Sequence, residues 1–338
     1  MKKIKVIQFG LGPIGIESLK LAADHAWLEV TGGVDIDPAK VGQTLAGLSG
    51  MPALGGARVY PSLDALFAAV GGPDLVLHTA GSSAAASFAQ MRPALERGIS
   101  VASTCEELIF PALKTPDLAR EFDTLCRRTG ARIAATGVNP GFVMEVLPIC
   151  LTGVSREVRS IYVERVVNAS TRRQPLQAKI GSGQDPADFR AKFAAGKAGH
   201  AGFQQSVALL AQAMGWRIDE IRESCEPVVA TSRVTTQFFD VAPGQSLGIH
   251  QKCAGLSGGE TKIVFDLQMY LDAPLPHDAI VIKGRPELNL VLNGGVAGDD
   301  ATVAALINIV PRLLAAAPGV RLMTELPLPA WKNPRSAA

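Results

Sequence analysis

The first 135 residues alternate between short apolar runs and longer stretches with helical spacing. A helix is predicted at residues 13–26, directly after the first apolar run. The predicted strands cover residues 4–9, 28–34, 75–78, 100–102 and 132–135. Strands separated by helix-length segments are typical of βαβ units, whose parallel sheet is covered on both faces. We therefore expect an α/β fold with a doubly wound Rossmann sheet over residues 1–138.

The pattern changes after Pro140. Helical spacing recurs at residues 188–216 and again at residues 300–317. The predicted strands cover residues 158–167, 228–239, 261–271 and 279–282. Consecutive strands without long helices between them predict a second, α+β domain on a largely antiparallel sheet. We assign substrate binding and dimerisation to this domain, residues 139–298, and expect the last helix and tail, residues 299–338, to return to the first domain.

Composition excludes several classes of protein. The 338 residues carry 33 basic and 31 acidic side chains, a balance that gives no reason to expect nucleic acid or an anionic membrane as partner. Five cysteines without a CxxC pair suggest neither a disulfide framework nor a metal site. Pro311 and Arg312 interrupt the most apolar stretch, so no membrane span is expected. Lys5 and Gln8 break any signal-peptide core, so we expect a cytoplasmic protein.

A GxGxxG motif follows the first predicted strand and opens the first predicted helix. In this motif Gly10 makes the tight turn, Gly12 lets the backbone approach a pyrophosphate, and Gly15 allows close packing of helix on strand. The intervening residues are Leu11, Pro13 and Ile14. Asp35, at the end of the next strand, would accept hydrogen bonds from the adenosine ribose, which favours NAD over NADP. Lys40 lies close enough in sequence to offset this preference, so NADP stays open.

Three further loops of small or polar residues follow strands at the same expected sheet edge. They contain Thr79, Ala80, Gly81 and Ser82 after the strand at 75–78, Thr104 and Cys105 after the strand at 100–102, and Asn139 after the strand at 132–135. Ligands of open α/β sheets bind beyond the carboxyl ends of strands. These loops therefore predict a cleft that the cofactor enters.

Two adjacent acids, Glu106 and Glu107, follow the strand at residues 100–102. Reduction of a carbonyl develops alkoxide character, which a carboxylate opposes, whereas an imine accepts hydride as an iminium cation, which a carboxylate stabilises. The same group can move protons to and from ammonia and water. The pair therefore favours C–N over C–O chemistry, although acids also occur at helix N-termini for the helix dipole alone.

Several other polar residues allow more than one interpretation. His78 lies inside a predicted strand and is interpreted as a packed core histidine. His200 lies between glycines and is suited either to helix packing or to a pocket. Arg172 and Arg173 are suited either to the surface or to binding a substrate carboxylate.

Taken together, the motifs resemble the native amine dehydrogenases, relatives of 2,4-diaminopentanoate dehydrogenase in the dihydrodipicolinate-reductase-like superfamily. The segments that carry the resemblance are GLGPIG, VDID, STCEEL (103–108), GVNPGF (137–142), NASTRR (168–173) and GHAGF (199–203). The resemblance implies NAD(P)-dependent reductive amination of a small ketone or aldehyde with ammonia, and the reverse oxidative deamination. It also implies a homodimer formed through the sheet of the second domain.

The resemblance also implies roles for individual residues. A glutamate of STCEEL is the catalytic acid/base of the family, which corresponds to Glu106, with Glu107 as the alternative. Asn139 and Phe142 would then lie at the nicotinamide and substrate pocket. The remaining pocket residues would be Asn168, His200 and Thr302. The chain lacks the paired-histidine and lysine signature of dihydrodipicolinate reductases, and Glu106 stands where homoserine dehydrogenases carry a lysine.

Three alternatives remain open at this point. A dehydrogenase of 2,4-diaminopentanoate or a related amino acid would require a substrate carboxylate. A carbonyl reductase would turn over without ammonia. A non-catalytic NAD(P) sensor would bind the dinucleotide and turn over no amine.

Overall fold

The computed structural model describes residues 3–335 and divides the chain into two compact units. Unit 1 comprises Met1–Phe142 and Ala297–Ala338, and unit 2 comprises Val143–Val296. The sequence suggested boundaries after residues 138 and 298 instead. Residues 1–2 and 336–338, at the ends of the first and third expected segments, lie outside the described residues.

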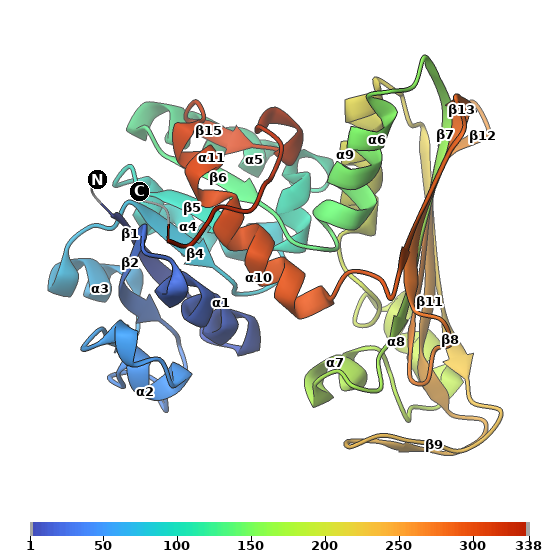
Figure 1. Ribbon diagram of the computed structural model, residues 1–338, viewed down its shortest axis with the longest axis horizontal. Helices are drawn as coiled ribbons and strands as arrows, with labels where there is room; N and C mark the ends of the chain where they lie inside the picture. Colours follow the sequence, from blue (N-terminus) through green and yellow to red (C-terminus); the bar gives the residue numbers. More distant parts are fainter. Residues whose placement is uncertain (1–2, 336–338) are drawn as a thin grey trace. The chain divides into compact units, whose positions relative to one another are not determined.

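Unit 1 contains a seven-stranded parallel sheet in the order β15-β6-β5-β4-β1-β2-β3 (Figure 1). The strands are β1 (Ile4–Phe9), β2 (Leu28–Val34), β3 (Val59–Tyr60), β4 (Leu75–His78), β5 (Ser100–Ser103), β6 (Arg132–Ala135) and β15 (Gly319–Arg321). Ile7 in β1 and Leu77 in β4 are fully buried, as expected for strands covered on both faces. The predicted doubly wound parallel sheet is confirmed.

Two groups of helices cover this sheet. α10 contacts both α1 and α11, and α4 contacts both α3 and α5. Their bounds, with the short α2, are α1 (Pro13–Asp24), α2 (Leu45–Ser49), α3 (Leu63–Val70), α4 (Ala84–Leu95), α5 (Pro116–Thr129), α10 (Gly298–Asn308) and α11 (Val310–Ala315). Leu19 in α1, Phe88 in α4 and Phe122 in α5 are fully buried, and the rings of Phe88 and Phe122 stack on each other. Burial of each such side chain stabilises the fold by about 1.5–3 kcal/mol.

The C-terminal segment of the chain belongs to unit 1. It packs α10 against α1 and adds β15 beside β6, with Gly319 opposite Arg132. The single helix expected at residues 300–317 is wrong, because the segment forms two helices that meet at Ile309. Pro311 has no N–H to continue the first helix and occupies the first turn of the second, where none is needed.

Unit 2 is built on a six-stranded sheet in the order β14-β13-β7-β12-β11-β8. Only β7 and β12 pair in parallel in this sheet, so the predicted, largely antiparallel arrangement is confirmed. Its strands are β7 (Glu157–Asn168), β8 (Glu220–Val229), β11 (Ser246–Ser257), β12 (Glu260–Tyr270), β13 (His277–Arg285) and β14 (Leu288–Asn293), and a separate pair is β9 (Val234–Thr235) with β10 (Asp240–Val241).

The described helices of unit 2 all lie on one side of its sheet in Figure 1. They are α6 (Leu147–Thr152), α7 (Gln174–Lys179), α8 (Pro186–Ala194) and α9 (Phe203–Met214). Gly255 in β11 explains how closely α9 packs, because a Cβ atom there would lie 2.6 Å from the Val207 side chain. No described helix of unit 2 covers the opposite face of the sheet, which we call the open face.

Three expectations for unit 2 are corrected by the structure. The helical stretch at residues 188–216 is two helices separated by a glycine-containing turn. The strand expected at residues 228–239 is wrong, because β8 ends at Val229 and the chain continues into the separate β9–β10 pair. The central strand β11 was missed, since glycines and polar residues dilute its apolar pattern. Each helix among residues 3–335 is too short or too polar to cross a membrane.

Candidate active site

The GxGxxG loop lies between β1 and α1, as its sequence pattern indicated. Gly10 adopts a left-handed conformation (φ +87°), and a Cβ atom on Gly15 would lie 1.9 Å from the carbonyl oxygen of Gly10. In contrast, a Cβ atom on Gly12 would meet no atom within 4 Å. Gly12 is also the N-cap residue of α1 and has no side chain to cap the first-turn amides. The start of α1 therefore presents backbone N–H groups in open space, which suits a phosphate.

Asp35 follows β2 and is held against this loop. Its Oδ2 atom accepts a hydrogen bond from the Leu11 amide (2.8 Å), and its Oδ1 atom accepts one from the Asp37 amide (2.9 Å). Lys40 Nζ lies 3.3 Å from Oδ2. Burial alone would raise the pKa of Asp35, but the two amides and Lys40 outweigh it and lower the pKa. Asp35 therefore carries its charge at neutral pH, beside the glycine loop.

The three expected loops lie at the carboxyl ends of β4, β5 and β6, which are adjacent in the sheet. Thr79 connects the first of them to the glycine loop, because its hydroxyl donates to Gly10 O (2.9 Å) and accepts from Gln8 Nε2 (2.9 Å). The amide of Thr104 donates to His78 O (3.0 Å). The sheet order thus brings residues 79–82, Thr104, Cys105 and residues 137–141 to one edge, beside residues 10–15.

Glu106 and Glu107 begin a 3-10 turn, Glu106–Ile109, just after Cys105. The two carboxylates are placed differently. Glu107 Oε2 accepts a hydrogen bond from the Ala84 amide (2.9 Å), and its Oε1 lies 3.3 Å from Lys114 Nζ. Glu106 is half-buried, and its charge acts on the neighbouring thiol of Cys105. Burial, with a smaller contribution from Glu106, raises the pKa of Cys105 to about 11, so this thiol is protonated and is not a nucleophile at neutral pH.

His78 is buried within β4, as predicted for a core histidine. Its Nδ1 atom lies 2.9 Å from Ser103 Oγ, and its Nε2 atom lies 2.9 Å from Gln90 Oε1. Burial lowers its pKa to about 4, so the ring is neutral at physiological pH. Ser103 Oγ in turn accepts the Cys105 amide (3.0 Å). The histidine therefore supports the acidic turn through Ser103, a role that the sequence did not reveal.

Asn139 and Thr302 both belong to unit 1. The Thr302 hydroxyl, on α10, accepts a hydrogen bond from the Val138 amide (3.2 Å), so the C-terminal segment supports the loop after β6. Both polar side-chain atoms of Asn139 are buried without a hydrogen-bond partner among the described residues. Unpaired buried amides are costly, so Asn139 is suited to a ligand that supplies a donor and an acceptor. Phe142 is the last residue of unit 1 before the chain enters unit 2.

The other two expected pocket residues, Asn168 and His200, belong to unit 2. Asn168 ends β7, and its Oδ1 atom accepts the Ser170 amide (2.9 Å). His200 precedes α9, where its amide donates to Gln251 Oε1 (2.7 Å) and its ring packs edge-on against Phe203. Both interpretations of His200, helix packing and a pocket, are compatible with these contacts.

A buried charged cluster in unit 2 escaped the sequence analysis. Arg165 in β7 and Asp278 in β13 are 3% and 1% exposed, and Arg165 Nε lies 3.6 Å from Asp278 Oδ1. Together they bind both backbone polar groups of Val296: Asp278 Oδ2 accepts its N–H (2.7 Å) and Arg165 donates to its carbonyl. Glu145, which is fully buried, accepts from the Ser206 hydroxyl and attracts Arg165. The cluster therefore holds the last residue of unit 2.

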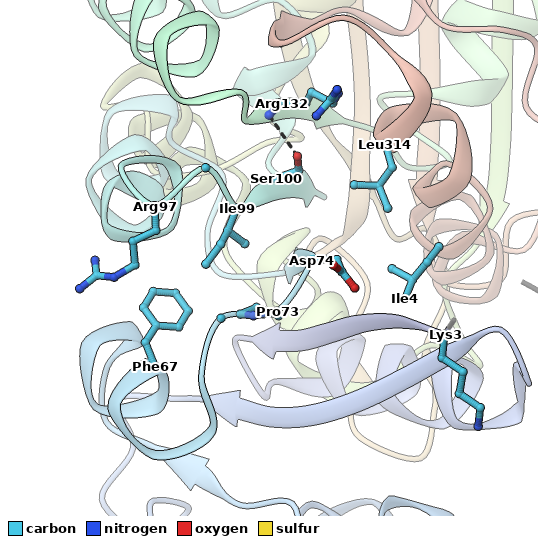
Figure 2. Close-up of a pocket in the computed structure, with 12 residues that line it drawn as sticks. Lys3, Ile4, Phe67, Pro73, Asp74, Arg97, Ile99, Ser100, Arg132 and Leu314 are labelled. Atoms are coloured by element: carbon cyan, nitrogen blue, oxygen red, sulfur yellow. Dashed lines mark hydrogen bonds between the residues drawn. The ribbon is translucent and has the colours of Figure 1, made fainter. Parts of the chain in front are cut away.

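A cavity of about 750 Å³ in unit 1 lies at the opposite edge of the parallel sheet. Ile4, Ser100 and Arg132, the first residues of β1, β5 and β6, contribute to its lining. Figure 2 shows Arg97 beside Phe67 and directed away from Asp74. None of the predicted site residues lines this cavity, so it does not belong to the candidate active site. Among residues 3–335 no group of histidine, cysteine and acidic side chains has the arrangement of a metal site.

Comparisons with known proteins extend over nearly the whole chain. Residues 142–334 match the family model described as the 2,4-diaminopentanoate dehydrogenase C-terminal domain. A 2,4-diaminopentanoate dehydrogenase from Acetoanaerobium sticklandii is 30% identical over 97% of this chain and 95% of its own length. An amine dehydrogenase from Streptomyces virginiae is 25% identical over 96% of both chains. The solved structure of an amine dehydrogenase from Mycobacterium smegmatis has the same fold, with a TM-score of 0.85 at 22% identity over 98% of both chains.

Proposed function

The chain belongs to the 2,4-diaminopentanoate dehydrogenase family, as its motifs predicted, and from this premise we propose that it oxidises a small amine with NAD and catalyses the reverse reductive amination. Glu106 is the catalytic acid/base of this proposal. The observation that carries it is the position of Glu106 at the carboxyl end of β5, on the sheet edge that also holds the glycine loop. Glu107, the alternative, already has partners for both carboxylate oxygens.

The residues of unit 1 fit a nicotinamide dinucleotide. The open space above Gly12 and the uncapped start of α1 suit the pyrophosphate. The ionised Asp35 suits the adenosine ribose hydroxyls and would repel the 2′-phosphate of NADP. Lys40, which could offset that repulsion, already pairs with Asp35 and lies 3.6 Å from Asp37. These contacts favour NAD. The loops of Thr79–Ser82 and Thr104–Cys105 would flank the dinucleotide, and the unpaired amide of Asn139 would bind its nicotinamide end.

A carboxylate at position 106 suits each stage of amine oxidation. When bound, the nicotinamide ring supplies the acceptor for the hydride that leaves the substrate carbon. Glu106 first takes a proton from the substrate ammonium group, which frees the nitrogen lone pair, and passes this proton on to solvent, so that the carboxylate regains its charge. Its negative charge then stabilises the iminium cation that remains. Glu106 finally transfers protons between the attacking water and the departing ammonia. In the direction of amination the same steps run in reverse, with Glu106 binding ammonia.

A substrate panel tests this proposal. The purified protein is assayed for NAD⁺ reduction at alkaline pH with carboxylate-free amines, with 2,4-diaminopentanoate and other amino acids, and with the matching alcohols. Turnover of an amine, together with ammonia-dependent oxidation of NADH by the corresponding ketone, is the expected result. Turnover of alcohols alone would indicate a carbonyl reductase instead. NADH binding without any turnover would indicate a non-catalytic sensor.

A second substrate class has a specific observation in its favour. The relative that is 30% identical over nearly its full length is named a 2,4-diaminopentanoate dehydrogenase, an enzyme of a carboxylate-bearing amine. The substrate pocket, with Phe142, Asn168, His200 and Thr302 as its proposed residues, would then need a cation for that carboxylate. Arg172 and Arg173, in the loop after β7, are the candidates. Replacing both by glutamine should raise KM for amino-acid substrates only, whereas an equal effect on carboxylate-free amines would argue for a structural role.

We also propose that a second copy of the chain covers the open face of unit 2. Apolar side chains on this face include Val281 and Val291, the latter 49% exposed. Its charged groups are paired within the sheet, as in His277–Glu164 (3.1 Å) and Lys252–Asp266 (2.8 Å), so the face can be buried without leaving isolated charges. Sedimentation equilibrium should show a dimer that Val291→Glu weakens. A monomer at all concentrations would contradict this.

A further inference from the structure

Glu107 links two loops at the carboxyl edge of the parallel sheet. Its carboxylate accepts the Ala84 amide (2.9 Å), and its own amide donates to Ser82 O (3.2 Å). These two bonds run in opposite directions between the acidic turn after β5 and the loop after β4. Lys114 Nζ, 3.3 Å from the other carboxylate oxygen, holds the Glu107 side chain from a third segment.

The bond to Ala84 takes the place of a helix cap. Ala84 is the first residue of α4, and the N-cap residue, Ser83, makes no side-chain capping bond. An uncapped helix start leaves backbone donors unsatisfied, and a carboxylate is the strongest common acceptor for them. Glu107 therefore supplies from another segment what Ser83 does not supply locally. The start of α4 and the acidic turn consequently cannot move independently of each other.

A second set of contacts holds the same turn from within the sheet. The Cys105 amide is bound to Ser103 Oγ (3.0 Å), which contacts the buried ring of His78 (2.9 Å). The backbone on the N-terminal side of Glu106 is thus fixed by Ser103, and the backbone on its C-terminal side is fixed by Glu107. The backbone is therefore held on both sides of Glu106, which limits the directions that its carboxylate can take.

We propose that Glu107 is the positioning residue of this site: it holds the Glu106 carboxylate in register with the loop of residues 79–82 and takes no part in proton transfer. The inference rests on the proposed function, in which Glu106 is the acid/base and residues 79–82 contact the dinucleotide. Proton transfer by Glu107 would break its bonds to Ala84 and Lys114 in every catalytic cycle. If Glu106 transfers the protons, the bonds of Glu107 to Ala84 and Lys114 stay intact throughout the cycle.

The conservative variant separates the two roles. Glu107→Gln keeps a carbonyl oxygen for the Ala84 amide but cannot exchange a proton, and Glu107→Ala loses both. We expect Glu107→Ala to lower kcat by about 10- to 100-fold through misplacement of Glu106. Glu107→Gln should stay within about 3-fold of the wild type, because an uncharged acceptor replaces most of the lost bond. Glu106→Gln should be inactive in the same assay.

A helix cap in unit 2 provides the matched control. Asp185 caps α8 by accepting the Ala187 amide (2.7 Å), so Asp185→Ala removes the same kind of bond away from the acidic turn. Its kcat should stay within about 2-fold of the wild type, since only local helix stability is lost. Fluorescence titration with NADH and thermal unfolding, run on every variant, identify any protein that has failed to fold.

Two results would overturn the inference. Glu107→Gln as inactive as Glu107→Ala, with Glu106→Gln active, would make Glu107 the acid/base. Unchanged kcat in Glu107→Ala would remove the positioning role. Hydrogen exchange in peptides covering residues 79–86 and 103–110 measures how firmly Glu107 joins the two loops, and it does not depend on turnover. Glu107→Ala should accelerate exchange in both peptides. If the wild type turns over no amine, the proposed function fails while this measurement still decides whether Glu107 joins the two loops.

Discussion

The two sheets hold their charged side chains in different places. In unit 1 the central strands β4 and β5 contain no acidic or basic residue other than the neutral His78, and the acids Asp35, Glu106 and Glu107 lie beyond strand ends. In unit 2 the charges of Arg165 and Asp278 lie inside the strands and face each other across the β7–β13 pairing. These charged residues of unit 1 lie at an edge of the sheet, whereas Arg165 and Asp278 are buried within the sheet of unit 2.

This difference has a physical cause. A strand covered by helices on both faces has no position for a charge except its end, where backbone amides and solvent provide partners. A strand of unit 2 can bury a charge because the neighbouring strand supplies the opposite one, as Asp278 in β13 does for Arg165 in β7. We therefore expect charges at the strand ends of unit 1 to govern reactivity and charges within the strands of unit 2 to govern stability.

The largest expected effect lies at the edge of unit 1. Glu106→Gln should reduce amination and deamination by about 10⁴-fold or more, because proton transfer and stabilisation of the iminium cation are both lost. NADH affinity and the unfolding midpoint should be nearly unchanged. Glu121→Gln, which alters an exposed ion pair with Arg92 elsewhere in unit 1, serves as the control and should retain full activity. Wild-type turnover in Glu106→Gln would refute the assignment.

The second effect lies in the core of unit 2. Arg165→Met should lower the free energy of unfolding by about 3–5 kcal/mol, because Asp278 and Glu145 would stay buried without their cation. Denaturant unfolding followed by circular dichroism measures the loss. Arg159→Met is the matched control on the same strand, where the partner, Glu157, is as exposed as the arginine. A stable Arg165→Met variant would mean that the buried pair is dispensable, and the contrast between the two sheets would fail.

The same contrast decides what could be predicted from the sequence. The strands of unit 1 were placed within a residue or so, apart from the short β3 and β15, because burial on both faces makes a continuous apolar run. The acidic turn was visible because charges stand out where such a run ends. β11 was missed because Gly255 and polar residues such as Gln251 interrupt its apolar pattern, and these serve contacts with α9 and the turn before it.

The buried pair of unit 2 could not be found in this way. Arg165 and Asp278 are separated by more than a hundred residues and meet only through the register of β7 and β13. The roles of the adjacent glutamates were likewise undecided in the sequence, since the partner of Glu107 is the amide of Ala84 in another loop. Periodicity reports which faces are buried, but it does not report which strands are neighbours.

A smaller effect is expected on the pH dependence of stability, because one histidine in each sheet has a shifted pKa and the two shifts have opposite directions. Burial lowers the pKa of His78 to about 4, so between pH 6.5 and 4 the unfolded chain binds a proton that the folded chain does not. Stability should therefore fall as the pH drops through this window, by about 1.5 kcal/mol from pH 6.5 to 5. His78→Gln should flatten that part of the profile.

His277 in unit 2 provides the opposite case. A backbone carbonyl, that of Leu275, and the Glu164 carboxylate raise its pKa despite some burial. Its contribution to stability is fully present below the unfolded pKa of about 6.5 and is lost as the pH rises through the higher folded value. His277→Gln should therefore weaken the protein at pH 5.5 and have little effect at pH 8.5. Parallel pH profiles for the two variants would contradict the assignment of opposite shifts.

The smallest expected effect concerns Asp35, which tests whether an edge charge can act on a ligand while it also serves the fold. Asp35→Asn keeps acceptors for the Leu11 amide but loses the charge that binds ribose hydroxyls, so NADH affinity should fall by about 10-fold. NADPH affinity should rise, because Lys40 would be released from its ion pair with Asp35. Fluorescence titration with both dinucleotides measures the change, with Asp37→Asn as the control for Lys40 alone. Equal binding of NADH and NADPH by the wild type would show that Asp35 only anchors the glycine loop. This charge at the edge of unit 1 would then serve the stability of the fold, as the buried charges of unit 2 are expected to do.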